Sequence, residues 1–387
     1  MTNKELFPPS RALLGSVERL CKITSPYAIS AENDSLFVQA MKEVIRWHQE
    51  KSTFYRQFLK DSGFDINKWD GDLVTIPSIP AEFFKYHAIK SVSDDNVHIN
   101  LTSSGTSGQK SQMFFDEWSL GCAQQMVDFI YDYYGWITPS KKTNYLLYTY
   151  QTEIDSKLGT AFTDNYLTKY APVNRADYTL KLTGKGGHDF DIFGAIKTLQ
   201  EYEVEELPVR IFGFPSFFYF TLQRMKELKY RPLKLSPESL VFLGGGWKGY
   251  ANQEIKKSEL YALAEEMLGI PNHRLRDGFG SVEHCIPYIE CSQHKFHVPV
   301  YSKVLIRDLK NLNLVGYDKP GFLQFISPYI TSAPANAVTM GDLAILHRGE
   351  TCTCGLKTDW FEILGRAGIS KNKSCAIAAA ELLKDFV

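Results

Sequence analysis

A short segment rich in serine, threonine and glycine has the residue types needed to bind phosphate. It covers residues 101–111 and has the sequence LTSSGTSGQKS. Small residues let backbone N–H groups approach an anion closely, and a lysine adds a positive charge. We therefore predict a phosphate-binding loop formed by Ser103, Ser104, Gly105, Thr106, Ser107, Gly108 and Lys110. A surface turn rich in serine and glycine is the alternative interpretation.

This segment does not match the P-loop of nucleotide-binding proteins, GxxxxGK[ST]. Gln109 separates Gly108 from Lys110, and the preceding glycine is too close to Gly108. The residues on both sides have the pattern of strands, whereas a P-loop leads from a strand into a helix. The sequence therefore predicts a hairpin-like phosphate loop between two strands.

Two pairs of side chains could bind a metal ion. Cys291 and His294 form a C-x-x-H pair, and Cys352 and Cys354 form a C-x-C pair further along the chain. Thiolates and imidazoles are the ligands of tetrahedral structural zinc sites, which leave no open position for water. We predict a structural zinc site from these four residues, with His297 as a rival ligand. Unligated thiols are the alternative.

Cys375 is a candidate nucleophile. Lys371 and Lys373 precede it, and nearby cations lower the pKa of a thiol and raise the fraction of thiolate. The cysteine also begins a short helix-like segment, whose N-terminal dipole would act in the same direction. The alternative is an ordinary small apolar residue that packs this helix.

The composition limits the classes of protein. Among 387 residues, 43 basic and 44 acidic side chains give a net charge of −1, so no global field attracts nucleic acid or an anionic membrane. No stretch reaches the roughly 18 apolar residues of a membrane span, and the N-terminus lacks the apolar core of a secretory signal. Seven cysteines are too few for a disulfide framework. We expect a cytoplasmic protein whose partners are small molecules or another protein.

Short apolar runs alternate with amphipathic segments between residues 144 and 290. The predicted strands are YLLYTY, VRIFGF, LVFLGGG and LRDGFG. The predicted helices cover residues 192–203, 216–228 and 253–268. This alternation favours an α/β domain with a buried sheet, in which ligands bind beyond the carboxyl ends of the strands.

The flanking parts of the sequence have other patterns. Residues 36–45 carry apolar side chains on one helical face, after a helix cap expected within residues 33–35, and prolines at 77 and 80 mark an extended connection. Strand-like runs follow one another between residues 297 and 364, which indicates a smaller β subdomain. We expect an α/β core over residues 1–296, a β-rich subdomain over 297–366 and a short C-terminal arm over 367–387.

The loop resembles the phosphate-binding loop of the adenylate-forming superfamily, which includes acyl- and aryl-CoA ligases. Further motifs follow in the order of that superfamily: LGGGWK, DGFGSVE, MGDLAIL and LGRAG. For ATP, the resemblance implies contacts from Gly245, Gly246, Phe279, Gly280, Ser281 and Asp342. Phe279 would stack on adenine, and Asp342 would bind both ribose hydroxyls. Glu283 would hold Mg²⁺, and Arg366 would take the place of the hinge arginine.

Two features depart from that pattern. The family's threonine before the glutamate is Val282 here, which leaves Ser281 as a candidate for the α-phosphate contact. The chain ends 21 residues after Arg366, where CoA ligases continue into a C-terminal domain with a catalytic lysine. The short segment after Arg366 and the motifs GGGWK, CTCG and LGRAGISKNKSCAIAAAELL together resemble the acyl-protein synthetase (LuxE) family. The resemblance implies an α/β adenylate-forming core, with the C-terminal domain reduced to a short tail.

The resemblance also implies an activity. A carboxylic acid, expected to be a fatty acid, would react with ATP in the presence of Mg²⁺ to give acyl-AMP and pyrophosphate. The acyl group would pass to Cys375 and then to an acceptor protein such as an acyl reductase. Lys110, Glu283, Arg366 and Cys375 would be the catalytic residues. The alternatives are a CoA ligase similar to phenylacetate-CoA ligase and a non-catalytic nucleotide-binding subunit.

Overall fold

The computed structural model describes residues 6–102, 112–151, 167–184, 187–247 and 249–367. The chain forms two compact units. The first comprises Met1–Tyr133, Gly280–Tyr288 and Lys295–Val387, and the second comprises Tyr134–Phe279 and Ile289–His294. The domain boundaries that we expected at residues 296 and 366 were based on strand-like sequence patterns rather than on contacts. They stay a prediction.

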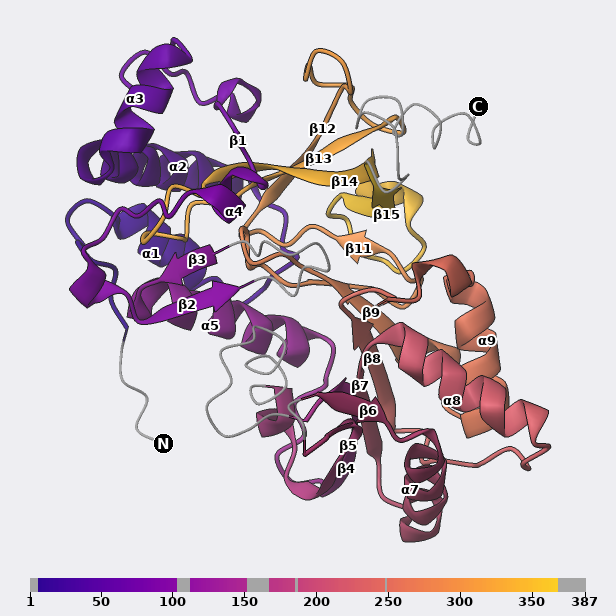
Figure 1. Cartoon of the computed structure of the whole chain (residues 1–387). Coiled ribbons are helices and arrows are strands. Elements are labelled where there is room, and N and C mark those ends of the chain that lie inside the picture. The colour runs from indigo at the N-terminus through magenta and orange to yellow at the C-terminus, as the bar shows by residue number, and fades with distance from the viewer. Residues whose placement is uncertain (1–5, 103–111, 152–166, 185–186, 248, 368–387) are drawn as a thin grey trace. The chain divides into compact units, whose positions relative to one another are not determined.

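A largely parallel sheet forms the centre of the second unit. In the described residues its strand order is β10-β9-β8-β7-β4-β5-β6 (Figure 1). Strands β5, β4, β7, β8 and β9 pair in parallel, and β6 is antiparallel to β5. The bounds are β4 Thr143–Tyr150, β5 Val173–Leu182, β6 His188–Phe190, β7 Val209–Gly213, β8 Leu240–Gly244, β9 Leu275–Phe279 and β10 Tyr288–Ile289. All four strands predicted between residues 144 and 290 are confirmed.

Helices α7 (Ile192–Glu205), α8 (Pro215–Glu227) and α9 (Lys257–Leu268) pack against this sheet (Figure 1). Their apolar faces share one buried cluster with alternate residues of the strands, such as Leu146 and Ile211. Alternate residues of a strand point to opposite faces, which explains why Leu146 and Tyr148 reach the helices. The three predicted helices are confirmed, although α9 begins at Lys257 rather than at residue 253.

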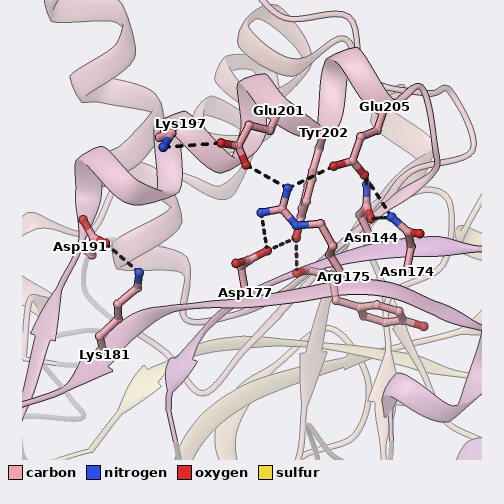
Figure 2. A network of polar contacts seen from close by, with 11 residues as sticks. Asn144, Asn174, Arg175, Asp177, Lys181, Asp191, Lys197, Glu201, Tyr202 and Glu205 are labelled. Atoms are coloured by element: carbon pink, nitrogen blue, oxygen red, sulfur yellow. Dashed lines mark hydrogen bonds and ion pairs between the residues drawn. The ribbon is translucent and has the colours of Figure 1, made fainter.

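A polar network ties β5 to α7. Figure 2 shows the guanidinium of Arg175 among three carboxylates. Its nitrogens lie 2.9 Å from Glu201, 3.1 Å from Glu205 and 3.3 Å from Asp177. The hydroxyl of Tyr202 donates to Asp177 at 2.7 Å, and the Arg175 guanidinium lies over the Tyr202 ring. The strand edge and the helix are therefore joined by charge as well as by apolar packing.

The order in which successive strands join the sheet reverses at β4, because β5 lies on one side of this strand and β7 on the other. At the end of β7, Gly213 has φ +129°, and a Cβ there would lie 2.3 Å from the Tyr148 carbonyl oxygen. Only glycine fits this close approach without strain. The carboxyl ends of β7, β8 and β9 meet at the same edge, which is where ligands bind in open parallel sheets.

The first unit begins with helices α1 (Gly15–Cys21), α2 (Ala31–Lys51) and α3 (Thr53–Asp61). The N-cap of α2 is Ser30, whose hydroxyl accepts a hydrogen bond from the Asn33 N–H at 3.0 Å. The cap expected within residues 33–35 was therefore wrong by about one turn. The prolines lie in an extended segment, as predicted, with β1 (Ile79–Pro80) before the single turn α4 (Phe83–Tyr86).

Helix α2 bonds to backbone groups that lie far along the chain. The indole N–H of Trp47 donates to the Thr331 carbonyl at 2.8 Å. The Nε2 atom of His48 lies 3.1 Å from the Ile330 carbonyl oxygen. Burial lowers the pKa of His48 to about 3, so this ring is neutral and donates through Nε2.

Strands β2 (Ile99–Thr102) and β3 (Gln112–Phe115) form an antiparallel pair that precedes helix α5 (Glu117–Tyr133). Thr102 is the register partner of Gln112. The prediction that the phosphate loop joins two strands is confirmed, and the loop residues 103–111 lie outside the described residues.

The C-terminal part of the first unit is a β-sheet, as predicted. Its order is β11-β15-β14-β13-β12 with antiparallel pairing, and β1 pairs in parallel with β14. The bounds are β11 Phe296–His297, β12 Lys303–Arg307, β13 Pro320–Ile326, β14 Ala337–His347 and β15 Trp360–Arg366. Strand β14 is the centre of this sheet, because β13 pairs along one edge while β1 and β15 share the other.

Candidate functional site

Three predicted site residues interact in the first unit. Asp342 on β14 and Arg366 at the end of β15 are register partners. The Nε of Arg366 lies 3.6 Å from the Asp342 Oδ1. Burial raises the pKa of Asp342, Arg366 opposes this rise, and the charge of Glu283 adds to it. The structure thus brings Glu283 close enough to Asp342 for their charges to interact.

Glu283 lies in a tight turn between β9 and β10. The N–H groups of His284 and Cys285 donate to the Ser281 carbonyl oxygen at 3.2 and 2.7 Å. The Ser281 hydroxyl lies 3.9 Å from the sulfur of Met340 on β14, which joins the turn to the sheet. Glu283 is only 6% exposed, and no hydrogen bond or ion pair to its carboxylate occurs within the described ranges. A nearly buried carboxylate without a neutralising partner is suited to bind a cation.

The adenine-binding residues predicted in the second unit lie at the ends of neighbouring strands. Gly244 on β8 and Gly278 on β9 are register partners. The turn after β8 contains Gly245 and Gly246 with φ +78° and +72°, a conformation that other residues rarely adopt. Phe279 is the last residue of β9 and is partly buried, and Gly280 follows it. A glycine turn and an aromatic ring therefore end adjacent strands at the edge where ligands bind.

A buried charge network supports the end of β9, and sequence analysis missed it. The Nζ atom of Lys257 on α9 lies 2.7 Å from Asp277 and 2.6 Å from Glu290. The hydroxyl of Tyr261 and the backbone N–H of Asp277 both donate to Glu290 at 2.8 Å. Glu290 has no exposed surface. This network fixes the backbone of Asp277, two residues before Phe279.

The network shifts the pKa of each carboxyl in a different direction. Burial raises the pKa of Asp277 to about 6, although Lys257 opposes that rise. Burial also works against the charge of Glu290, but its contacts with His294, Lys257 and Tyr261 hold its pKa below the ordinary value. Residues at 257, 277 and 290 carry no shared motif, so only the three-dimensional structure could reveal the network.

His284 and Cys285 follow Glu283 in the turn, where His284 is buried and Cys285 is partly buried. The ring of His284 stacks on Phe325, and its Nε2 lies 2.8 Å from the Tyr288 hydroxyl. Burial lowers the pKa of His284 to about 3 and raises the pKa of Cys285 to about 11. A neutral imidazole and a protonated thiol are therefore expected at neutral pH, which argues against a reactive Cys–His pair here.

Residues of the predicted zinc site lie in both units. In the first unit, the Cys354 sulfur lies 3.3 Å from the Nε2 of the rival ligand His297, and Cys352 belongs to the same connection between β14 and β15. In the second unit, the Nε2 of His294 lies 2.8 Å from the Asn272 Oδ1. The zinc site and its ligand set stay a prediction.

Two parts of the predicted site cannot be placed. The phosphate loop, with Lys110 and the residues 103–108, lies outside the described residues, and so does Cys375. Their roles stay predictions. Within the part of the chain that the structure describes, no helix is both long and apolar enough to cross a membrane.

Solved structures of known enzymes share this fold. A 2-hydroxyisobutyryl-CoA ligase in complex with 2-HIB-AMP and CoA matches 97% of this chain and 83% of its own, with a TM-score of 0.64 and 14% identity. The same ligase in a postadenylation state with 2-HIB-AMP also gives a TM-score of 0.64, at 13% identity. The fold is that of the adenylate-forming ligases.

Comparisons of sequence identify the branch. The family model described as acyl-protein synthetase, LuxE, matches residues 12–384. A long-chain-fatty-acid–luciferin-component ligase of Vibrio harveyi is 24% identical over 90% of this chain and 89% of its own. The ligase of the same name from Aliivibrio fischeri is 25% identical over 95% of this chain and 94% of its own. The chain belongs to the acyl-protein synthetase (LuxE) family, as its sequence motifs indicated. It is an ATP-dependent ligase that forms an acyl adenylate and transfers the acyl group.

Proposed function

We propose that this enzyme activates a long-chain fatty acid as acyl-AMP, transfers the acyl group to its own Cys375, and delivers it to an acceptor protein such as an acyl reductase. The observation that carries this proposal is the meeting of Glu283, Asp342 and Arg366 in the first unit, in the roles that the superfamily motifs imply. The names of the two relatives support a fatty acid as the substrate.

The adenosine of ATP would be held by two kinds of contact. Phe279 offers a ring face for adenine beside the glycine turn of Gly245 and Gly246, which lets a planar base approach the backbone. Asp342 offers two carboxylate oxygens, each able to accept a hydrogen bond from a ribose hydroxyl. Arg366, whose side chain is 59% exposed, can shift from Asp342 toward the nucleotide because it is bonded loosely in this structure.

The chemical step would depend mainly on charge and position. The acid oxygen attacks the α-phosphorus and pyrophosphate leaves, so negative charge builds on the phosphates. Lys110 and the backbone N–H groups of its loop would bind the leaving pyrophosphate. Glu283 would hold Mg²⁺, which neutralises phosphate charge when it is bound. The predicted zinc site near His297 is separate from the nucleotide site and would take no part in these steps.

The second step would be thiolysis. The thiolate of Cys375 attacks the acyl carbon of the mixed anhydride, AMP leaves, and an acyl thioester remains on the enzyme. A thiol of the acceptor protein then takes the acyl group by the same type of exchange. ATP is the co-substrate of this reaction, and we expect the cytoplasm to supply it.

ATP–pyrophosphate exchange tests the first step without an acceptor. The purified enzyme is assayed with carboxylic acids of increasing chain length, with and without an aromatic ring. We expect exchange that depends on the acid and is fastest with long-chain fatty acids. If no acid supports exchange, the proposed activity is wrong.

Intact mass measurement tests the second step. After incubation with ATP and the best acid, the wild type should gain the mass of one acyl group, and Cys375→Ser should not. The variant should keep its exchange activity, because the adenylate forms before Cys375 acts. CoA-dependent product formation that survives Cys375→Ser would instead identify a CoA ligase.

A further inference from the structure

The hydroxyl of Tyr329 bonds to the turn that carries Glu283. Tyr329 lies in the first unit, in the connection between β13 and β14, and has no exposed surface. Its hydroxyl donates to the His284 carbonyl oxygen at 2.9 Å. His284 directly follows Glu283, so this bond holds the backbone one residue beyond the proposed magnesium ligand.

The conformation of this turn is one that few residues adopt. Cys285 has φ +55°, which is uncommon for a residue other than glycine. The N–H groups of His284 and Cys285 share one acceptor, the Ser281 carbonyl oxygen. The Tyr329 hydroxyl also interacts with the Cys285 thiol. Tyr329 therefore contacts both residues that follow Glu283.

The side chain of His284 is fixed as well as its carbonyl group. Its Nε2 lies 2.8 Å from the Tyr288 hydroxyl, which donates to the Ser302 hydroxyl at 2.9 Å. The ring stacks on Phe325 of β13, with 4.4 Å between the ring centroids. The residue next to Glu283 is thus held by buried groups at both its ring and its backbone.

The segment that carries Tyr329 is itself anchored. The Thr331 N–H donates to the Ser119 hydroxyl at 2.9 Å, and the Thr331 hydroxyl donates to the Asp116 carboxylate at 2.6 Å. Asp116 also accepts from the Ser119 N–H at 2.7 Å. Asp116 directly follows β3, the strand that begins after the phosphate loop. Polar contacts therefore lead from the Glu283 turn through this segment to the strand pair that the phosphate loop joins.

The direction of the Glu283 carboxylate depends on this turn, because no partner holds the carboxylate itself within the described ranges. Mg²⁺ demands near-ideal octahedral geometry, so a carboxylate ligand must be well positioned. We propose that Tyr329 is a positioning residue, whose hydroxyl holds the turn so that the Glu283 carboxylate points to the Mg²⁺ of the nucleotide. This inference rests on the proposed acid activation, in which Glu283 holds Mg²⁺.

The effect of Mg²⁺ on nucleotide binding tests this role without catalysis. Calorimetry with α,β-methylene-ATP, which cannot be cleaved between its α- and β-phosphates, gives the nucleotide affinity in Mg²⁺ and in EDTA. The ratio of the two affinities measures the coupling between ion and nucleotide. We expect a ratio clearly above one for the wild type and near one for Glu283→Gln. A ratio of one in the wild type would overturn the inference.

Tyr329→Phe removes only the hydroxyl. It should lower this ratio by about 3–10-fold, the effect of one lost hydrogen bond. Tyr301→Phe is the matched control, because Tyr301 is equally buried and its hydroxyl also donates to a backbone carbonyl, that of Ile23. Both variants should lose stability in urea, but only Tyr329→Phe should lower the ratio. A wild-type ratio in Tyr329→Phe, or the same decrease in both variants, would overturn the proposal.

ATP–pyrophosphate exchange separates positioning from general damage. With the best acid, Tyr329→Phe should need more Mg²⁺ for half-maximal rate but reach the wild-type kcat at saturating Mg²⁺. A lower kcat that excess Mg²⁺ does not restore would contradict a positioning role. If no acid supports exchange in the wild type, the proposed activity fails, whereas the calorimetric ratios still decide the role of Tyr329.

Hydrogen exchange of the wild type gives a test that needs no variant, in case Tyr329→Phe does not fold. With α,β-methylene-ATP present, replacing EDTA by Mg²⁺ should slow exchange in peptides that cover residues 281–285 and 329–331 together. The second peptide responds because the Tyr329 hydroxyl is bonded to the turn. Slower exchange in the first peptide alone would overturn the proposal.

Discussion

Asp342 and Arg366 face each other across the β14–β15 pair, with 3.6 Å between the carboxylate Oδ1 and the guanidinium Nε. Asp342 is only 9% exposed, whereas the Arg366 side chain is 59% exposed. The carboxylate is thus fixed by the sheet while its partner can move. This asymmetry fits an anchor for the nucleotide and a residue that responds to its binding.

Asp342→Asn should raise the KM for ATP by about 10–100-fold. The ribose hydroxyls would lose hydrogen bonds to a charged carboxylate, and such bonds contribute about 1.5–3 kcal/mol. ATP–pyrophosphate exchange at varied ATP concentration measures this. Glu362→Gln on β15 is the control, since Glu362 contacts His347 and is the register partner of Ile345 rather than of Asp342. An unchanged KM for ATP in Asp342→Asn would remove Asp342 from the nucleotide site.

Lys257→Met should destabilise the protein by about 3 kcal/mol, because it leaves the fully buried carboxylate of Glu290 and the partly buried carboxylate of Asp277 without their cation. Urea unfolding measures the free energy. The neighbouring Lys256→Met removes an exposed lysine and should change it by less than about 0.5 kcal/mol. Equal stability of the two variants would mean that the network contributes little.

The pKa of Asp277 predicts how the stability depends on pH. Burial raises it from 3.8 to about 6, so the folded chain binds this proton more tightly than the unfolded chain does. The stabilising contribution is therefore complete below pH 4 and is lost as the pH rises to about 6. The free energy of unfolding of the wild type, relative to Asp277→Asn, should fall over this window by about 1–3 kcal/mol. Urea unfolding at pH 4.5 and pH 7 tests it, and a difference that rises with pH would contradict the assignment.

Arg175→Met should destabilise the second unit by about 1 kcal/mol, since it removes several solvent-screened ion pairs at the β5–α7 contact (Figure 2). Arg224→Met is the control, because it removes a single ion pair of similar exposure, with Glu227. A double-mutant cycle with Glu205→Gln separates the pair from the rest of the network. A coupling energy near zero would show that Arg175 acts through packing alone.

The sequence predicted the second unit well for a physical reason. Its parallel strands are buried on both faces, so they appear as short apolar runs between amphipathic helices. The N-cap of α2 was harder to predict, because Ser30 and residues 33–35 are all of types that cap helices equally well. Which of them begins the helix depends on packing rather than on local preference.

The candidate site was only partly predictable. Its motif residues could be named because each lies in a short segment that resembles a superfamily motif, such as DGFGSVE around Phe279 and Glu283. The charge network of Lys257 and Glu290 at the end of β9 could not be predicted, because contacts between residues far apart in the sequence leave no local pattern. His297 lies 3.3 Å from Cys354 because β11 pairs with β15, a relationship that the C-x-x-H spacing does not contain.

The bonds from α2 to Ile330 and Thr331 constrain how the protein is made. Trp47 and its acceptor are 284 residues apart, and His48 and its partner are 282 apart. At about 5–20 residues per second, a ribosome needs roughly 15–60 s to synthesise the intervening chain. During that time α2 can pack against α1 and α3, but its bonds to Ile330 and Thr331 can form only after residue 331 has left the ribosome.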